Sequence, residues 1–478
     1  MSILLCQQAL TLAPLCFVVL CALSATCLAE DREALATDAF RPQLRYTPRY
    51  GWMNDPNGLI YDHGKWHFFC QHNPTNVVWG NMHWNHAVSD DLVHWQEQGE
   101  ALCPDDQGTM FSGSAVVDRD GVAGLGRDVQ VIFYTHDVKD GYHFVQRLAW
   151  SKDRMTYEKL GGDPVVPFRA RKNRDPKVFW HAPTKRWVMA LYGTESGRHT
   201  MWIYSSANLR DWQRESSYVG GVAAKNDLWL FECPGLEELR IEGETNTAWV
   251  VWGAMPEYAV GAFDGRRFTP AEERLPGIAY VPGVPYHGNE APYYAAQTFN
   301  DVPDGRKIWM AWFRLPKFEG AKTRHSASIP HELSLRRTTK GLRLVRHPAR
   351  ELEKLRCGEC MSLEKFNGEL AELHLSCKVA AGGKVSFDLR GVDLSYDAQT
   401  RQLKMAGTQV PWILTDGHLE LVVYLDRVGA EVFSKDGLQM MPVHDAFPQS
   451  DRSTCSVTSM RGVSDAVFTA YKLRSIWK

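Results

Sequence analysis

Short apolar runs separated by polar turns dominate the chain after its first thirty residues. β-Branched and aromatic residues fill runs such as 130–134, 187–192 and 249–252, and such runs are typical of strands. Gly, Pro, Asn and Asp interrupt them about every ten residues, as expected for tight turns. No amphipathic helix longer than about twelve residues is apparent. The pattern therefore predicts an all-β protein.

A weak internal repeat runs through the first half of the chain. Each copy begins with a Ser, continues through a polar turn and closes on an aromatic residue. The closing residues are Trp95, Tyr157, Trp212 and, in a degenerate fourth copy, Phe268, so the steps are 62, 55 and 56 residues. A period near 60 favours four-stranded propeller blades over the shorter repeats of a solenoid. Residues 40–345 have room for five such units.

The pattern changes after about residue 350. Residues 385–389 alternate apolar and polar side chains, and residues 419–425 form a second, more apolar strand candidate. Two packed sheets are the expected arrangement for about 120 residues of this kind. The charged link that carries Pro348 is typical of a domain boundary. We therefore predict a β-propeller over 38–346 and a β-sandwich over 356–478.

Residues 1–29 are predicted to be a signal peptide. Residues 9–29 are almost wholly apolar, and residues 27–29 resemble a small-residue cleavage site. No Lys or Arg precedes the apolar run, so an uncleaved anchor is the alternative, although Pro14 and the polar Ser24 argue against it. We expect an exported protein, either secreted or periplasmic.

Seven of the eleven cysteines follow that segment. An odd number in an exported protein leaves at least one thiol free or paired between chains. Cys357 and Cys360 are too isolated from further Cys or His pairs to predict a zinc site. A local disulfide between them, or partners in Cys377 and Cys455, is the favoured interpretation.

Composition excludes some partners and leaves others open. The chain has 54 Lys and Arg against 56 Asp and Glu, a net charge of −2, which removes the electrostatic argument for binding nucleic acid. It also has 17 Trp, 17 Tyr and 20 Phe, which suit either sugar rings or apolar cores. His83 and His86 lack the spacing and third ligand of a typical metal site. No metal and no cofactor are predicted.

Polar residues recur at the blade spacing beside apolar strands. Asp55, Ser112, Asp175 and Glu232 are separated by 57, 63 and 57 residues. If the first strand of each blade lines the central channel, these residues lie at one depth around one axis. Three converging carboxyl groups suit the cleavage of an acetal, which needs one carboxylate at the oxocarbenium-like centre and one proton donor for the leaving oxygen. The alternative is that they are ordinary turn formers.

At these residues the chain resembles glycoside hydrolase family 32, the β-fructofuranosidases, which include invertases, inulinases and levanases. The first motif is Trp-Met-Asn-Asp-Pro-Asn-Gly at 52–58. The resemblance continues through 71–74, 79–87, the Phe-Ser-Gly-Ser, Arg-Asp-Pro and Glu-Cys-Pro-Gly motifs, 294–299, and Asp426-Arg427 and 431–433 in the second domain. It covers nearly all of the chain after residue 40.

The resemblance implies a five-bladed β-propeller followed by a β-sandwich, and a retaining mechanism. Asp55 would be the nucleophile, Glu232 the general acid and then base, and Asp175 the stabiliser of the transition state. The residues implied to line the fructose pocket are Asn54, Gln71, Trp79, Phe111, Ser112 and Arg174. Apolar walls including Trp229 and Phe231 are expected to keep Glu232 protonated.

The expected activity is exo-acting release of fructose from sucrose, inulin or levan. The alternatives are a fructosyltransferase of the same fold and a non-catalytic carbohydrate-binding propeller. Trp52, Trp79, Trp84 and Phe111 are the aromatic candidates for sugar contact. The chain departs from the family pattern at Pro292, where an Asp is usual, and Glu290 is a possible substitute.

Overall fold

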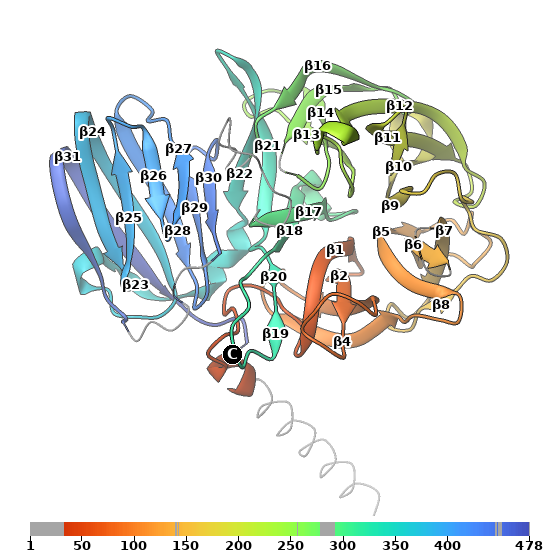
Figure 1. The fold of residues 1–478 in the computed structure, drawn as a ribbon, viewed down its shortest axis with the longest axis horizontal. Coiled ribbons are helices and arrows are strands. Elements are labelled where there is room, and N and C mark those ends of the chain that lie inside the picture. Colours follow the sequence, from red (N-terminus) through yellow and green to blue (C-terminus); the bar gives the residue numbers. More distant parts are fainter. Residues whose placement is uncertain are drawn as a thin grey trace, which may run out of the picture.

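The protein is described here by a computed structural model that covers residues 33–138, 141, 143–255, 257–277, 292–444, 447 and 452–477. The predicted signal peptide and Glu290 lie outside these residues. Figure 1 shows a ring of blades beside a β-sandwich, which confirms the predicted fold class. Among the described residues, no helix is long and apolar enough to cross a lipid bilayer.

Each of the five blades in the described chain is built on four antiparallel strands. The first two blades contain β1 (Gly51–Asp62), β2 (Lys65–Asn73), β3 (His83–Ser89) and β4 (Trp95–Leu102), then β5 (Gly108–Asp118), β6 (Val129–Val138), β7 (Phe144–Ser151) and β8 (Glu158–Lys159). The third and fourth contain β9 (Arg174–His181), β10 (Arg186–Glu195), β11 (Arg198–Ser206) and β12 (Gln213–Val222), then β13 (Gly235–Arg240), β14 (Thr247–Trp252), β15 (Tyr258–Phe263) and β16 (Phe268–Leu275). The fifth contains β17 (Tyr293–Thr298), β18 (Lys307–Phe313), β21 (His331–Thr338) and β22 (Gly341–Pro348), and β20 (Ser326–Ala327) pairs with β18. Short 3-10 helices are η1 (Ala182–Thr184), η2 (Ala223–Lys225), η3 (Pro303–Gly305), η4 (Arg350–Leu355) and η5 (Leu363–Lys365).

The repeated motif marks the turn between the third and fourth strands of a blade. Strands β3, β7 and β11 end at Ser89, Ser151 and Ser206. Each serine hydroxyl accepts a hydrogen bond from a backbone N–H of the turn, at 3.1, 2.9 and 3.2 Å. A serine hydroxyl that binds the backbone two or three residues on stabilises such turns. The closing aromatic residue of each copy begins the fourth strand or directly precedes it. The period of the motif is therefore the period of the blades.

The ring closes where the chain returns to its first blade. The short strand β19 (Thr323–Arg324) pairs in parallel with β1, so Gly51 lies opposite Thr323 and Trp52 opposite Arg324. The inner strands β1, β5, β9, β13 and β17 then surround one axis (Figure 1). Closure in this way brings residues far apart in sequence to the same ends of the channel.

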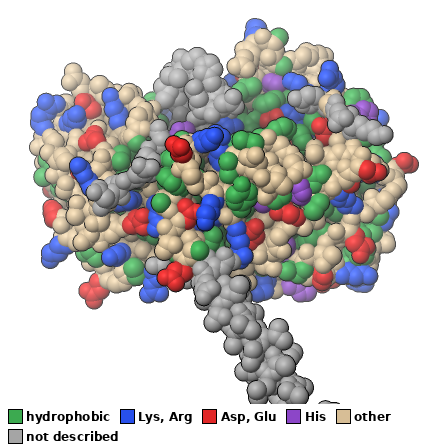
Figure 2. Space-filling view, turned by 60° about the horizontal axis from the view of Figure 1, so that its bottom comes forward, with side chains coloured by type: hydrophobic (Ala, Val, Ile, Leu, Met, Phe, Trp, Pro, Cys, Tyr) green, Lys and Arg blue, Asp and Glu red, His purple; other side chains and the backbone are tan. Residues whose placement is uncertain are grey.

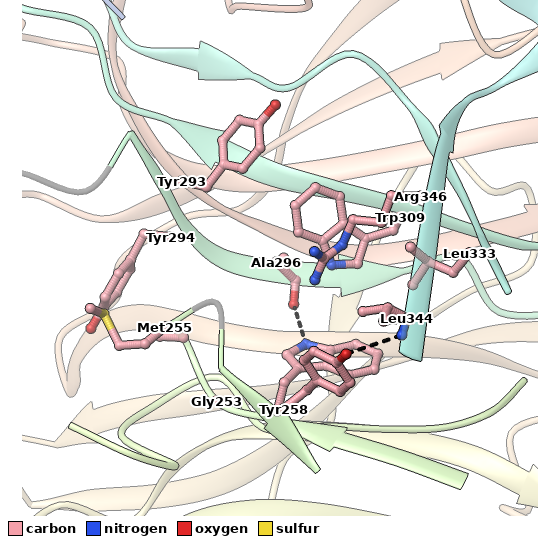
Figure 3. A pocket seen from close by; sticks show the side chains of 12 residues that line it. Gly253, Met255, Tyr258, Tyr293, Tyr294, Ala296, Trp309, Leu333, Leu344 and Arg346 are labelled. Carbon is pink, nitrogen blue, oxygen red and sulfur yellow. Dashed lines mark hydrogen bonds between the residues drawn. The ribbon is translucent and has the colours of Figure 1, made fainter. Parts of the chain in front are cut away.

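Aromatic side chains join the fourth and fifth blades. Trp252 Nε1 donates to the Ala296 carbonyl at 3.2 Å, and the Leu344 N–H donates to the Tyr258 hydroxyl at 3.1 Å (Figure 3). These residues surround a small cavity that Arg346 also lines. Buried indole and phenol groups are stable when their polar atom finds a partner, so the hydrogen bonds and the packing hold the two blades together.

The sandwich is organised by two long strands, β24 (Ala371–Leu389) and β31 (Cys455–Leu473), which pair with each other. The pairing register of β24 and β31 shifts between Val379 and Lys384. Such an irregularity allows a long strand to bend and pass from one sheet of a sandwich to the other. The first half of β24 also pairs with β28 and the second half with β25. The remaining strands are β23 (Arg356–Ser362), β25 (Val392–Asp397), β26 (Gln402–Met405), β27 (Thr408–Pro411), β28 (His418–Leu425), β29 (Ala430–Ser434) and β30 (Met440–Val443).

The predicted disulfide pairing is wrong, because all seven cysteines after residue 33 are free thiols. Cys377 lies opposite Leu419 and Cys455 lies opposite Leu389, near the two ends of β24. Cys360 is exposed and Cys357 is half-buried, whereas Cys377 and Cys455 are buried. Both side chains pack in the apolar core of the sandwich.

Charges of both signs share one face of the molecule. On the face drawn in Figure 2, the described Lys and Arg side chains are interspersed with Asp and Glu. This distribution agrees with the net charge of −2 for the whole sequence. A mixed surface of this kind favours an uncharged partner over a polyanion.

A buried charged network connects the propeller with the sandwich. Glu431 on β29 accepts hydrogen bonds from Arg45 Nε at 3.0 Å and from the Ile329 backbone N–H at 3.1 Å. His331 Nε2 lies 3.0 Å from its other oxygen, and the Tyr293 hydroxyl donates to that same oxygen. The side chains of Arg45, Glu431 and His331 are at most 1% exposed. One carboxylate therefore binds the segment before β1, the fifth blade and the sandwich.

We expect Glu431→Gln to destabilise the protein by about 3 kcal/mol, because removing one member of a buried ion pair leaves the other charge uncompensated. The measurement is chemical denaturation at pH 7. Glu420→Gln is the matched control, since Glu420 pairs with Lys435 at the surface, where such pairs contribute about 1 kcal/mol or less. Equal midpoints for the two variants would contradict the assigned role of the network.

Candidate active site

The predicted site residues lie where the inner strands begin. Asp55 is in β1, Ser112 in β5 and Asp175 in β9, whereas Glu232 lies three residues before β13. A cavity of about 400 Å³ opens at this end of the channel. Its lining includes all nine residues predicted from the sequence, namely Asn54, Asp55, Gln71, Trp79, Phe111, Ser112, Arg174, Asp175 and Glu232. The topology therefore brings together the residues that the blade spacing singled out.

Asp55 is oriented by two side-chain donors. The Ser112 hydroxyl donates to Oδ2 at 2.7 Å, and the Asn54 amide donates to Oδ1 at 3.2 Å. Trp52 Nε1 donates to the amide oxygen of Asn54 at 2.9 Å and so fixes that amide. Burial raises the pKa of Asp55 above its usual value, the hydrogen bond from Ser112 opposes this, and the negative charge of Glu232 adds to it.

Arg174 connects the other two acids. Its guanidinium donates to Glu232 Oε1 and lies 3.8 Å from Asp175 Oδ2. The Tyr294 hydroxyl, from β17, donates to the second oxygen of Glu232. The backbone N–H of Cys233 donates to Asp175 Oδ2 at 3.0 Å. The start of β9, the loop before β13 and the start of β17 are thereby held together around the cavity.

The backbone at these acids adopts an uncommon conformation. Asp175, Glu232 and Cys233 have φ angles of +65°, +55° and +43°, in the left-handed region that non-glycine residues seldom occupy. The hydrogen bond from the Asp175 N–H to Thr135 Oγ1, at 2.9 Å, helps to hold this geometry. Such strain is concentrated at functional sites, where surrounding contacts impose it.

Two groups beside Asp55 and Glu232 have shifted pKa values. Burial and the negative charges of Glu232 and Asp55 raise the pKa of Asp175 to about 7, against the opposing positive charge of Arg174. Burial, followed by the nearby carboxylates, also raises the pKa of the Cys233 thiol well above its usual value. Its Sγ lies 3.5 Å from Asp175 Oδ2 and 3.6 Å from Asp55 Oδ2. A neutral thiol here serves as a hydrogen-bond donor to both acids and not as a nucleophile.

The surroundings of Glu232 differ from the apolar walls expected from the sequence. Phe231 lines the cavity, but Trp229 packs in the core between the third and fourth blades. The direct partners of Glu232 are polar, the guanidinium of Arg174 and the hydroxyl of Tyr294. Neighbours along the chain point to different sides of a turn, which is why adjacency to Glu232 did not identify its contacts.

Only two of the four aromatic candidates for sugar contact line the cavity. Trp79 is 59% exposed, and its ring meets Phe111 edge to face with centroids 6.2 Å apart. The prediction is wrong for Trp84, which is fully buried and donates through Nε1 to the Phe111 carbonyl at 3.0 Å. It is also wrong for Trp52, which acts on the site through Asn54.

Six residues that line the cavity were not predicted from the sequence. They are Met82, Phe144, Leu228, Tyr294, Trp312 and Arg314. Tyr294 carries a signal, because it opens the 294–299 motif on the inner strand of the fifth blade. Trp312 and Arg314 lie at the end of the second strand of that blade, where the blade spacing predicts no site residue.

At the unusual Pro292, the chain supplies a backbone carbonyl, which accepts the Arg314 N–H at 2.8 Å. The guanidinium of Arg314 lies over the rings of Tyr294 and Trp312, at 4.3 and 4.4 Å from their centroids. A stacked cation therefore forms part of the cavity wall on the side where the family pattern has an acid.

The sequence profile of the glycosyl hydrolases family 32 N-terminal domain matches residues 45–348, which is more than half of the chain. The chain belongs to glycosyl hydrolase family 32. The matched span includes all five blades and every residue of the cavity, so the family resemblance seen in the motifs is confirmed.

Known family 32 proteins resemble this one along most of its length. The levanase of Bacillus subtilis (strain 168) is 32% identical, across 92% of this chain and 71% of the levanase. The extracellular exo-inulinase of Aspergillus awamori is 28% identical, across 92% of this chain and 95% of its own. A crystal structure of exo-inulinase from Aspergillus awamori superposes with a TM-score of 0.80 at 25% identity, covering 92% of this chain and all of that one.

Proposed function

We propose that this family 32 glycoside hydrolase is a retaining, exo-acting β-fructofuranosidase that removes terminal fructose from sucrose, inulin or levan. The observation that carries the proposal is the arrangement of Asp55, Asp175 and Glu232 around one cavity, linked by Arg174 and Cys233. Relatives named levanase and exo-inulinase support the substrate class.

In the proposed reaction, a carboxylate oxygen of Asp55 attacks C2 of the fructosyl unit while the bond from C2 to the bridging oxygen breaks. Glu232 transfers its proton to that oxygen, and the rest of the sugar leaves as an alcohol. Glu232 then takes a proton from water, whose oxygen attacks C2 and displaces Asp55. Fructose is released with its original configuration, and both carboxyl groups return to their starting state.

The other cavity residues have binding roles in this proposal. Asp175 accepts hydrogen bonds from fructose hydroxyls and thereby stabilises the positively charged transition state. Arg174 orients Glu232 and donates to the sugar, and Trp79 with Phe111 forms the aromatic rim. The remaining proposed fructose contacts are Asn54, Gln71 and Ser112.

Hydrogen bonds link the inner strands beneath the cavity. Gln297 Nε2 donates to the Gly113 carbonyl at 2.9 Å, and Ser114 Oγ donates to the Pro176 carbonyl at 2.7 Å. Lys177 Nζ, also buried, donates to the Thr298 carbonyl at 2.9 Å. These bonds tie the inner strands together below the acids, and the relative named exo-inulinase supports exo-action.

Incubation with sucrose, inulin and levan tests the proposal, with free fructose, free glucose and longer products separated by chromatography. We expect fructose as the first product from all three, and proton NMR of early time points should show retention at C2. Products longer than the substrate would identify a fructosyltransferase. Binding without any product would identify a carbohydrate-binding propeller.

We expect Ser112→Ala to move the acid limb of the kcat/KM profile to higher pH by about one unit. The Ser112 hydroxyl stabilises ionised Asp55, and a hydrogen bond to a charged group contributes about 1.5–3 kcal/mol. Without it the pKa of Asp55 rises further, and a nucleophile that must be ionised loses activity at a higher pH. Ser216→Ala, whose hydroxyl binds the Arg266 carbonyl far from the acids, is the control. An unshifted limb in Ser112→Ala would contradict the assignment of Asp55.

We also propose that the protein is exported and is secreted or periplasmic, and that its catalytic and sandwich units span 38–346 and 356–478. The extracellular relative from Aspergillus awamori supports export. The segment between β22 and β23, which contains η4 and no strand, supports the boundary between the two units. Sequencing the mature N-terminus should show a start after Ala29.

A further inference from the structure

A second cavity, of about 240 Å³, opens at the far ends of the inner strands. Asp175 is the second residue of β9, whereas Trp180, which lines the second cavity, is the seventh. Five residues of strand span about 16 Å. On β5 the active-site cavity is lined by Ser112 and the second cavity by Val116. The two cavities therefore lie at opposite ends of the same strands.

Tryptophan exposure distinguishes these two cavities from the rest of the molecule. All seventeen tryptophans lie in the described part of the chain. Two of them are exposed, Trp79 at 59% and Trp180 at 47%. Trp79 lines the active-site cavity and Trp180 the second one. An exposed apolar side chain marks a binding surface when it is continuous with other apolar walls, as Trp180 is with Trp187 and Trp249 in the second cavity.

The second cavity combines aromatic walls with a polar rim. Trp180 meets Trp187 edge to face with centroids 5.1 Å apart, and Trp249 forms another wall. Glu238 and Asp301 are exposed carboxylates that also line it, and the Lys307 ammonium in the lining donates to the buried Glu237 at 2.7 Å. Carboxylates accept hydrogen bonds from hydroxyl groups and repel anions. Aromatic faces beside hydrogen-bond acceptors suit a neutral polyhydroxylated ligand.

We propose that this cavity is a non-catalytic binding site for a fructan chain, with Trp180 as the stacking platform. The choice of a fructan rests on the function proposed above, and the choice of a neutral sugar rests on the cavity itself. Because the two cavities face opposite ends of the propeller, this site holds a second chain or a distant part of the same chain. Binding at two places raises the effective concentration of chain ends near Asp55.

Trp180 could also have a purely structural role, which the test must distinguish from ligand binding. It lies directly opposite Trp187 in the β9–β10 register, and such cross-strand aromatic pairs stabilise hairpins. A purely structural Trp180 would affect folding and sucrose hydrolysis together. A binding residue would affect polymeric substrates alone.

The experiment measures retardation of the full-length protein in native gels that contain levan, inulin or dextran. The parent is Asp55→Asn, so that the polymer is not consumed. We expect levan or inulin to retard the parent, and Trp180→Ala in that background to bind roughly tenfold more weakly, a difference of about 1.4 kcal/mol. Trp180→Phe should retain part of the binding. Val467→Ala, an exposed apolar residue of the sandwich, is the matched control and should bind like the parent.

In the active protein, Trp180→Ala should raise KM for the polymer with kcat unchanged and leave sucrose kcat/KM at the wild-type level. Equal retardation of parent and Trp180→Ala would overturn the site, as would a parallel loss of sucrose turnover. Equal retardation by dextran would overturn the choice of fructan. If wild-type protein hydrolyses no fructoside while Trp180-dependent retardation persists, the proposed activity fails and the binding site stands.

Discussion

Asp55→Asn is expected to lower kcat for sucrose by about 10⁴-fold or more, the scale seen when a nucleophile is removed. An amide oxygen does not form the fructosyl ester, so the first step stops. Asn keeps the size of Asp and still accepts the Ser112 hydrogen bond that now binds Oδ2 at 2.7 Å. We therefore expect sucrose to bind, as measured by calorimetry, while fructose release measured enzymatically disappears.

The fold of Asp55→Asn should be unharmed, and at pH 8 it should be at least as stable as the wild type. Burial raises the pKa of Asp55, so its ionised form is disfavoured in the folded state. A carboxyl group with a raised pKa lowers the stability of the folded protein as the pH increases above the pKa of that group in the unfolded chain. Replacing it with a neutral amide removes that cost. Asp120→Asn, a surface acid, is the control. Release above about 1% of the wild-type rate in Asp55→Asn would contradict the nucleophile assignment.

Glu232→Gln is expected to reduce sucrose hydrolysis by about 10³-fold, within the range for loss of a general acid and base. The defect should depend on the leaving group. Fructosyl fluoride releases fluoride without protonation, so its first step should proceed and the fructosyl enzyme should accumulate. Added azide, which needs no general base, should then restore turnover and give fructosyl azide.

The two variants separate the roles of the two carboxyl groups. Azide should not rescue Asp55→Asn, because no fructosyl enzyme forms in it. Equal impairment of Glu232→Gln on sucrose and fructosyl fluoride would mean that Glu232 positions Arg174 and Tyr294, which it contacts, and takes no part in proton transfer. Fluorimetric denaturation of both proteins excludes unfolding as the cause.

Much of the architecture could be predicted from local sequence. The Ser-turn-aromatic motif recurs because Ser89, Ser151 and Ser206 stabilise the same turn in successive blades through hydroxyl-to-backbone bonds. Local bonds of this kind need only a few residues, so their spacing survives in the sequence. The same spacing located Asp55, Ser112, Asp175 and Glu232 at one end of the channel.

Contacts between distant segments were not predicted, because they depend on the direction of side chains across strands. Sequence alone placed Trp84 beside the sugar, yet its ring is fully buried. It paired Cys357 and Cys360 with each other or with Cys377 and Cys455, yet all four are free thiols. It surrounded Glu232 with apolar groups, whereas its partners Arg174 and Tyr294 come from the third and fifth blades.

The sequence by itself determined the fold class, the blade period and the identity of the three acids, because periodicity and turn chemistry are local properties. The tertiary structure alone decided how those acids differ from one another. Burial and mutual charge raise the pKa of Asp175 to about 7, and ring closure brings Arg174, Tyr294 and Arg314 to the cavity wall. It also placed Trp79 and Trp180 at opposite ends of the same strands. These features arise from packing between distant segments, whose geometry exists only after the ring has closed.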